Sequence, residues 1–316
     1  MIKLVLLIGG FSLLIFQQYI LPIPVQIQYI FFLTGIVILG VPHGAADLLI
    51  ATQNAADDKK SFSKLYFFIN YLSRLLLFAT ILWFFPLPGN LLFILFAAYH
   101  FGETDLHKFN TNSFIGKFFI TSYGLVILSV ILLHNFQEIR PLFQLFSSGI
   151  KYAAVIDFIG LHTNHITLLF GLLFLISSIL YFSTTKSNKI LQKQFFIHFL
   201  LILVILYNLP MIVGFTFYFV VWHSFLSLKN IVNYLRRDNV FSAAVIIKQI
   251  LIYSVLALAG IAVFGLTGFM FINLNSIIGY IFLSLAVLTA PHMQIMHNMY
   301  TSIRSRKNII SNLPAL

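Results

Sequence analysis

Cysteine is absent from the 316-residue chain, and charged residues make up only 9% of it. Without cysteine there can be no disulfide, thiolate zinc site, Cys-ligated iron–sulfur cluster or covalently attached c-type haem. Soluble globular domains carry roughly 25% charged residues, so this composition excludes a water-soluble globular domain. The ten histidines are the remaining side chains that bind transition metals strongly.

Hydrophobic residues, by contrast, make up 60% of the chain, and the mean hydropathy is +0.97. A bilayer core accepts about 20 apolar residues per helix. Continuously apolar runs without period-2 alternation indicate helices rather than a barrel. We therefore predict an all-α polytopic bundle that forms one integral membrane domain over residues 1–316. The ten predicted spans lie near residues 2–21, 25–50, 64–85, 88–106, 114–134, 162–183, 193–208, 210–228, 242–268 and 274–300.

The basic residues predict the orientation of these spans. Of the 19 Lys and Arg residues, 15 fall on one side of the alternating loops, whereas only Arg140 and Lys151 fall on the other; Arg74 and Lys248 lie within spans. Cytoplasmic loops are enriched in Lys and Arg, so we expect both termini in the cytoplasm and a multi-pass protein of the cytoplasmic (inner) membrane. The net charge of +11 is then explained by topology and gives no reason to expect nucleic-acid binding. Segment 135–161 has charged residues among apolar ones, and we expect it to form an amphipathic helix at the outer surface.

Four histidines lie inside predicted spans, where ionisable groups are costly and usually functional. The spans are the second, fourth, eighth and tenth, which run in the same direction, and each histidine lies in the second half of its span. All four are therefore predicted at one depth, in the cytoplasmic half of the membrane. The residues are His43, His100, His223 and His292. Two of them follow Pro42 and Pro291, and because proline removes a helical hydrogen bond, we expect broken helices there.

Imidazole ligands suit iron, copper, zinc or nickel. Asp47 and Glu103 follow His43 and His100 by about one helical turn, where a carboxylate can accept the second ring N–H of a ligand histidine. Helix-end charges and direct carboxylate ligation are alternatives for these two acids. A histidine that only hydrogen-bonds a neighbouring helix is the alternative for each imidazole. His297 is a reserve candidate.

At these motifs the chain resembles the Brp/Blh family of bacterial and archaeal membrane β-carotene 15,15′-dioxygenases. The resemblance extends in motif order and hydropathy over residues 25–300. Each motif is short, whereas the ordered set is fairly specific. The matching motifs are Pro42-His43-Gly44-Ala45 with Asp47, His100-Phe101-Gly102 with Asp105, Trp222-His223-Ser224, and Pro291-His292.

The resemblance implies an Fe2+ enzyme that uses O2 to cleave β-carotene at its central 15,15′ double bond into two all-trans-retinal molecules. A microbial rhodopsin is the retinal acceptor that it suggests. Three histidines (His43, His100 and His223) match positions expected to bind iron. Family members often carry a further histidine one turn after the Trp-His motif, where this chain has Ser227. His292 is then the preferred fourth ligand, with water as the alternative. Candidates for the surrounding shell are Asp47, Glu103, Asp105 and Ser227.

Three other functions compete with this interpretation. A non-haem iron desaturase would need clustered HxxHH or HxxxH boxes, which the sequence lacks. A haem b cytochrome would use paired histidines on facing spans as axial ligands. A transporter would use an intramembrane His/Asp relay across the whole bilayer, whereas the outer halves of the spans carry few ionisable groups.

Overall fold

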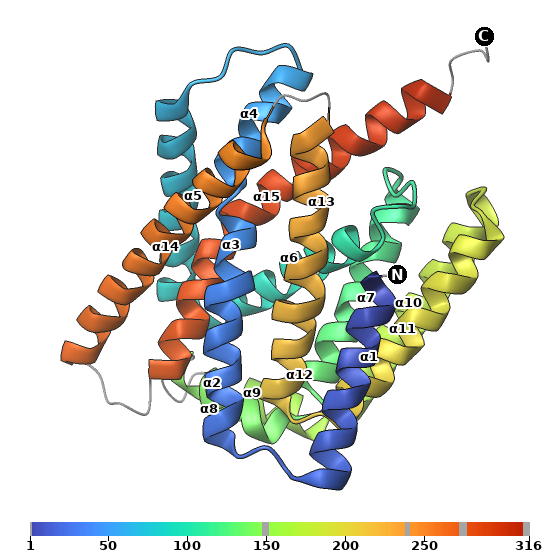
Figure 1. The fold of residues 1–316 in the computed structure, drawn as a ribbon. Helices are drawn as coiled ribbons and strands as arrows, with labels where there is room; N and C mark the ends of the chain where they lie inside the picture. The colour runs from blue at the N-terminus through green and yellow to red at the C-terminus, as the bar shows by residue number, and fades with distance from the viewer. Residues whose placement is uncertain (1, 147–151, 238–240, 272–276, 312–316) are drawn as a thin grey trace.

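The computed structural model describes residues 2–146, 152–237, 241–271 and 277–311, and every regular element in these ranges is a helix (Figure 1). In chain order the helices are α1 (Ile2–Ile15), η1 (Phe16–Ile20), α2 (Val25–Gly35), η2 (Ile36–Gly40), α3 (Val41–Gly44), α4 (Asp47–Asp57), α5 (Lys64–Phe84), α6 (Pro86–Asp105), α7 (Phe114–Leu132), α8 (Phe136–Phe146), α9 (Ala153–Leu161), α10 (Thr163–Thr184), α11 (Lys189–Asn208), α12 (Met211–Phe215), η4 (Thr216–Ser224), α13 (Phe225–Arg236), α14 (Ala243–Phe271) and α15 (Ile277–Ser311). The elements marked η are π-helical. The all-helical prediction is confirmed.

Eight helical segments in the described part of the chain are long and apolar enough to cross a membrane. They correspond to eight of the ten predicted spans. The predicted spans near 88–106 and 274–300 form α6 and α15 but are not among the eight. In α6 the polar residues Glu103 and Asp105 lie at the C-terminal end, which lowers its apolar content. The chain is thus a multi-pass helical membrane protein, while the count of ten stays a prediction.

Local sequence signals explain most helix boundaries. Side chains of Ser63, Ser113 and Asn188 cap α5, α7 and α11 by accepting hydrogen bonds from free backbone N–H groups of the first turn. Proline begins α6 and precedes α12. At the start of a helix the backbone N–H has no partner within the helix, so its absence in proline breaks no hydrogen bond. The links between these neighbouring helices are short: residues 21–24 before α2, residue 85 before α6 and residues 209–210 before α12.

The innermost layer of the bundle is formed by α6, α7, α12 and η4, which contribute many of the fully buried side chains. Two glycines allow α6 and α7 to pack backbone to backbone. A Cβ atom at Gly102 would overlap the carbonyl oxygen of Ile120, and one at Gly124 would overlap that of Ala98. Small residues at such crossings are the usual basis of close helix packing in membranes.

The described parts of residues 135–161 form α8 and α9. An ion pair of 2.5 Å between Arg140 and Asp157 connects the two helices. Residues 147–151 of this segment lie outside the described residues. Figure 1 shows α8 and α9 at the end of the bundle where α2 and α12 begin, whereas α4 and α13 finish at the opposite end. The relative placement of these segments agrees with the predicted sidedness. Which end faces the cytoplasm stays a prediction.

Candidate metal centre

The four intramembrane histidines meet in the core of the bundle. Their imidazole rings form a closed circuit, with centroid separations of 4.9 Å for His43 and His292, 5.4 Å for His292 and His100, 4.8 Å for His100 and His223, and 5.7 Å for His223 and His43. None of the four residues is more than 5% exposed. Each histidine comes from a different helical element. The sequence predicted that the four lie at one depth, and in the structure their rings are in contact.

Irregular helices carry two of these histidines. The π-helix η2 leads directly into the short helix α3, which contains His43 and is followed by a turn at Ala45 and Ala46. The nine-residue π-helix η4 contains His223 near its end. π-Helical turns are rare and occur often at functional sites, because they rotate side chains away from the regular α-helical positions.

The expected break at Pro291 is wrong, because α15 runs through this residue as one continuous helix. Proline is tolerated in membrane helices where neighbouring groups satisfy the freed backbone carbonyl. The expected irregularity around Pro42 is present: a π-helix precedes α3 and a turn follows it.

Several ring nitrogens of the cluster have no hydrogen-bond partner. Both nitrogens of His100 and of His223 are buried and unpaired, and so is Nε2 of His292. Nδ1 of His43 also lacks a well-formed hydrogen bond, although the carbonyl groups of Leu39 and Gly40 lie nearby. An unsatisfied buried polar group typically costs about 1–3 kcal/mol. A common ligand would explain why adjacent rings carry so many unpaired nitrogens.

One carboxylate contacts the cluster directly, and its partner is not the expected one. Asp47 was expected beside His43, but its Oδ1 lies 2.7 Å from Nδ1 of His292. The other oxygen, Oδ2, accepts a hydrogen bond of 3.2 Å from the hydroxyl of Tyr71. Asp47 thereby fixes the His292 ring at Nδ1 and leaves Nε2 as its unpaired nitrogen, because a histidine that donates Nδ1–H to a carboxylate keeps Nε2 available as a metal-ligand atom.

Glu103 does not accompany His100 as expected. Its carboxylate is fully buried and pairs with Arg304 at 2.7 Å and with Nδ1 of His297 at 3.1 Å. Both partners belong to α15, so this ion pair connects α6 to α15 away from the four rings. His297, the reserve ligand, is occupied by Glu103 and by the hydroxyl of Tyr99.

Asp105 lies behind the cluster. Its carboxylate accepts hydrogen bonds from the hydroxyl groups of Tyr123 at 2.6 Å and Tyr218 at 3.1 Å, and from the indole N–H of Trp222 at 3.1 Å. Tyr218 and Trp222 both belong to η4, and Trp222 directly precedes His223. Asp105 therefore holds the π-helix against α6 and acts on the cluster through the backbone.

Ser227 is fully buried, and its hydroxyl has no hydrogen-bond partner. It follows η4 on α13. Its proximity to the rings stays a prediction.

The donor set suits a transition metal such as iron, since imidazole nitrogens are typical ligands of Fe2+ and Zn2+. As the side chains stand, no group of three or more His, Asp or Glu residues in the described part of the chain is placed so that it could hold a metal ion. The torsion that turns an imidazole ring is broad, so rotation of the four rings is the first adjustment that a shared ion would require. The chemistry and the unpaired atoms of the cluster therefore fit such an ion.

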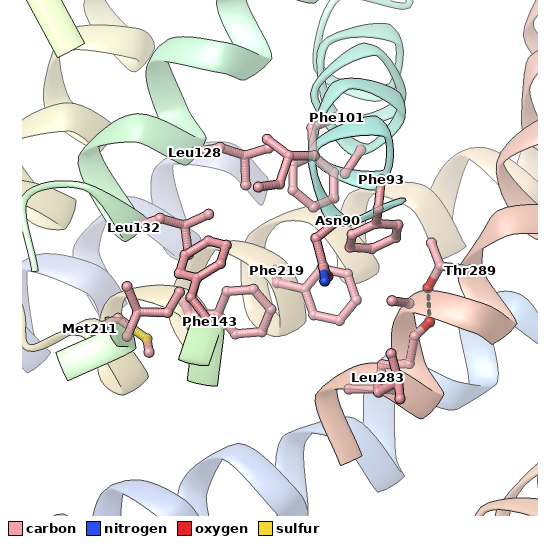
Figure 2. Close-up of a pocket in the computed structure, with 16 residues that line it drawn as sticks. Asn90, Phe93, Phe101, Leu128, Leu132, Phe143, Met211, Phe219, Leu283 and Thr289 are labelled. Atoms are coloured by element: carbon pink, nitrogen blue, oxygen red, sulfur yellow. Dashed lines mark hydrogen bonds between the residues drawn. The ribbon is translucent and has the colours of Figure 1, made fainter. Parts of the chain in front are cut away.

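An apolar pocket lies among helices α6, α7, α8, α12, η4 and α15 (Figure 2). It holds about 930 Å³ of empty space, including the part that is open to the surroundings. Figure 2 shows the rings of Phe93, Phe143 and Phe219 around it. Phe101 and Phe219 line the pocket and also contact His223, with ring centroids 4.6 Å and 6.2 Å away. The pocket therefore borders the histidine cluster.

The polar groups at the pocket are already satisfied. Asn90 donates to the carbonyl oxygen of Pro86, and Thr289 donates to that of Leu285. Ile139 and Phe143 of α8 close one side. Such a lining favours a hydrocarbon ligand, because it offers almost no free hydrogen-bonding group.

Sequence reasoning missed the aromatic residues that support the site. Tyr71 contacts Asp47, while Tyr123 and Tyr218 bind Asp105. With 36 Phe and 14 Tyr in the chain, composition gives no signal for particular members. Trp222 could have been noticed, since it directly precedes a candidate ligand.

Comparison with known families gives one match: the family model described as "BCD: Beta-carotene 15,15'-dioxygenase" covers residues 34–300. This range contains all four histidines of the cluster. Comparisons with curated proteins and with solved structures gave no significant match.

Proposed function

Because this chain belongs to the β-carotene 15,15′-dioxygenase family, whose members cleave β-carotene to retinal, we propose that His43, His100, His223 and His292 together hold one Fe2+ ion for that reaction. The observation that carries the proposal is the closed circuit of four buried rings with unpaired nitrogens. The family match favours this function over a transporter or a haem b cytochrome.

The reaction converts one C=C bond of β-carotene and one O2 molecule into two aldehydes, so that each retinal receives one oxygen atom. When bound, iron supplies the one-electron chemistry that O2 needs to react with a closed-shell alkene. The protein needs no nucleophile for this step. Its part is to hold the ion, position the polyene and exclude water.

The substrate site that we propose is the apolar pocket beside the cluster. Phe101 and Phe219 line it and contact His223, and an apolar lining binds a polyene by removing its surface from water. Since helices of the membrane bundle line the pocket, the proposal has β-carotene enter and retinal leave within the bilayer. An acceptor such as a microbial rhodopsin would then take retinal directly from the membrane.

We also propose that all ten predicted spans cross the cytoplasmic membrane and that both termini face the cytoplasm. The excess of 15 basic residues on one side supports this orientation. In Figure 1, α8 and α9 lie at one end of the bundle, and α4 and α13 finish at the other. This arrangement supports loops that alternate between the two sides of the membrane.

The test measures two quantities on detergent-purified protein: bound iron and retinal formed from β-carotene. Replacing any of the four histidines by alanine should lower both, whereas His162→Ala, at a partly exposed residue distant from the cluster in the chain, should change neither. Full iron and turnover in His43→Ala would refute the proposed centre. A Soret band in the purified protein would instead indicate haem.

The pocket is tested separately by filling it. Ala97 and Ala286 are buried and line the pocket. Ala97→Phe and Ala286→Phe should abolish retinal formation while iron content stays at the wild-type level. Ala244→Phe, at an exposed position of α14, is the control. Unchanged turnover in both pocket variants would place the substrate elsewhere.

A further inference from the structure

A second pocket is lined by Trp222 and shares no lining residue with the apolar pocket. It holds about 500 Å³ of empty space, including its open part. Its lining combines polar groups with an apolar wall from α11. The lining residues that matter here are Lys3, Lys108, His198, Trp222, Phe195 and Phe199.

Positive charge is in excess at this pocket. Lys3 lies on α1, and its ammonium nitrogen is 5.6 Å from the centre of the Trp222 ring, within the range of a cation–π contact. Lys108 and Lys229 lie close enough to repel this ammonium group, and Asp105 lies close enough to attract it. The pocket lining itself thus contains two lysines, Lys3 and Lys108, and one carboxylate, Asp105.

That carboxylate does not neutralise Lys3 by an ion pair. Both oxygens of Asp105 accept hydrogen bonds from uncharged side chains, those of Tyr123, Tyr218 and Trp222. Among the described residues, Lys3 has no carboxylate within ion-pair distance. An anion that enters this pocket would therefore meet a lysine side chain that no carboxylate of the described residues pairs with.

We infer that this pocket binds the phosphate group of an anionic phospholipid, with Lys3 and Lys108 as its principal contacts. Basic pockets between membrane helices on the cytoplasmic side are typical sites for anionic headgroups. The apolar side chains of α11 in the lining, Leu191, Phe195, Phe199 and Ile202, suit an acyl chain. Exposed residues on the same helix, such as Ile197 and Leu200, place it at the lipid-facing surface. The inference does not depend on the iron site.

Trp222 provides a direct probe of binding. The chain has two tryptophans, and the other, Trp83, is 80% exposed. In a Trp83→Phe background, all tryptophan emission comes from Trp222. Binding of an anion beside Lys3 changes the charge next to the indole ring, so it should shift or quench this emission.

The experiment reconstitutes the full-length Trp83→Phe protein in nanodiscs of phosphatidylcholine, with and without phosphatidylglycerol. Phosphatidylglycerol should change Trp222 emission in a saturable way, and bound lipid detected by mass spectrometry should follow the same curve. Lys3→Gln and Lys108→Gln should each weaken binding about fivefold, the effect of losing one Lys–headgroup interaction. Lys117→Gln, on α7 outside the pocket lining, should leave it unchanged.

Phosphatidylcholine nanodiscs with added inorganic phosphate distinguish a lipid from a soluble ion. A response to phosphatidylglycerol and none to phosphate supports the lipid assignment. An equal response to inorganic phosphate would overturn the lipid while locating a soluble anion at Lys3. No response to either probe, or equal loss of binding in Lys117→Gln, would overturn the site.

Discussion

Nδ1 of His292 and Oδ1 of Asp47 lie 2.7 Å apart although 245 residues separate them in the chain. Both side chains are buried, with 3% and 4% exposure. This contact joins α15 to the first residue of α4, so the acid that follows one candidate ligand in sequence orients a different one. The proposed iron centre therefore depends on how α4 and α15 pack together.

Asp47→Asn should weaken iron binding about 10- to 100-fold, the usual cost of changing the carboxylate behind a ligand histidine. Asparagine lacks the negative charge of Asp47, which raises the basicity of His292 and so strengthens it as a metal ligand. Iron titration of the apoprotein measures the effect. Asp58→Asn, whose carboxylate is exposed and pairs with Lys60, is the matched control, and equal affinity in the two variants would contradict the role of Asp47.

Asp105→Asn should lower both stability and iron affinity. The new amide cannot accept from all three donors that surround the carboxylate, and each unsatisfied group costs about 1–3 kcal/mol. Release of η4 should shift Trp222 emission, measured in the Trp83→Phe background, and should loosen His223. A loss of stability with unchanged emission and unchanged iron affinity would show that Asp105 supports the fold without positioning the ligand.

Gly124→Ala should destabilise the protein by about 1–3 kcal/mol, since the added methyl group overlaps the carbonyl of Ala98 and forces α6 away from α7. Gly171→Ala in α10 is a matched control, because no atom lies within 4 Å of its new Cβ. Thermal unfolding in detergent compares the two. Because α6 carries His100, we expect iron loss in Gly124→Ala alone. Equal melting temperatures would argue against close α6–α7 contact.

Ser227→His should restore part of the iron binding that His292→Ala loses, provided that Ser227 faces the ion. An imidazole four residues after His223 can share its helical face, and two histidines at that spacing can bind one metal. Iron content and retinal formation are compared across wild type, both single variants and the double variant. Loss without rescue would place Ser227 away from the metal. Full activity in His292→Ala would limit the protein ligands to His43, His100 and His223.

Topology can be mapped by single cysteines, because the chain has none of its own. Gln144→Cys on α8 should react with an impermeant maleimide in intact cells, whereas Lys186→Cys, between α10 and α11, should react only after permeabilisation. Both positions are exposed. The opposite pattern would invert the proposed orientation.

The sequence alone was sufficient for the membrane class, the helical fold and the family. Long apolar runs specify helices in lipid because every backbone polar group must be satisfied within the segment. The same pattern located His43, His100, His223 and His292 on separate spans at a common depth. These are local properties, since each depends on one stretch of chain and on its direction across the bilayer.

The tertiary structure decided which polar groups meet. Sequence spacing assigned Asp47 to His43 and Glu103 to His100, but the structure pairs them with His292 and Arg304. Hydrogen bonds between distant helices depend on helix rotation and crossing, and two π-helical segments alter that rotation here. The apolar pocket likewise needs side chains from α6, α7, α8, η4 and α15 together, so periodicity within any one helix cannot reveal it.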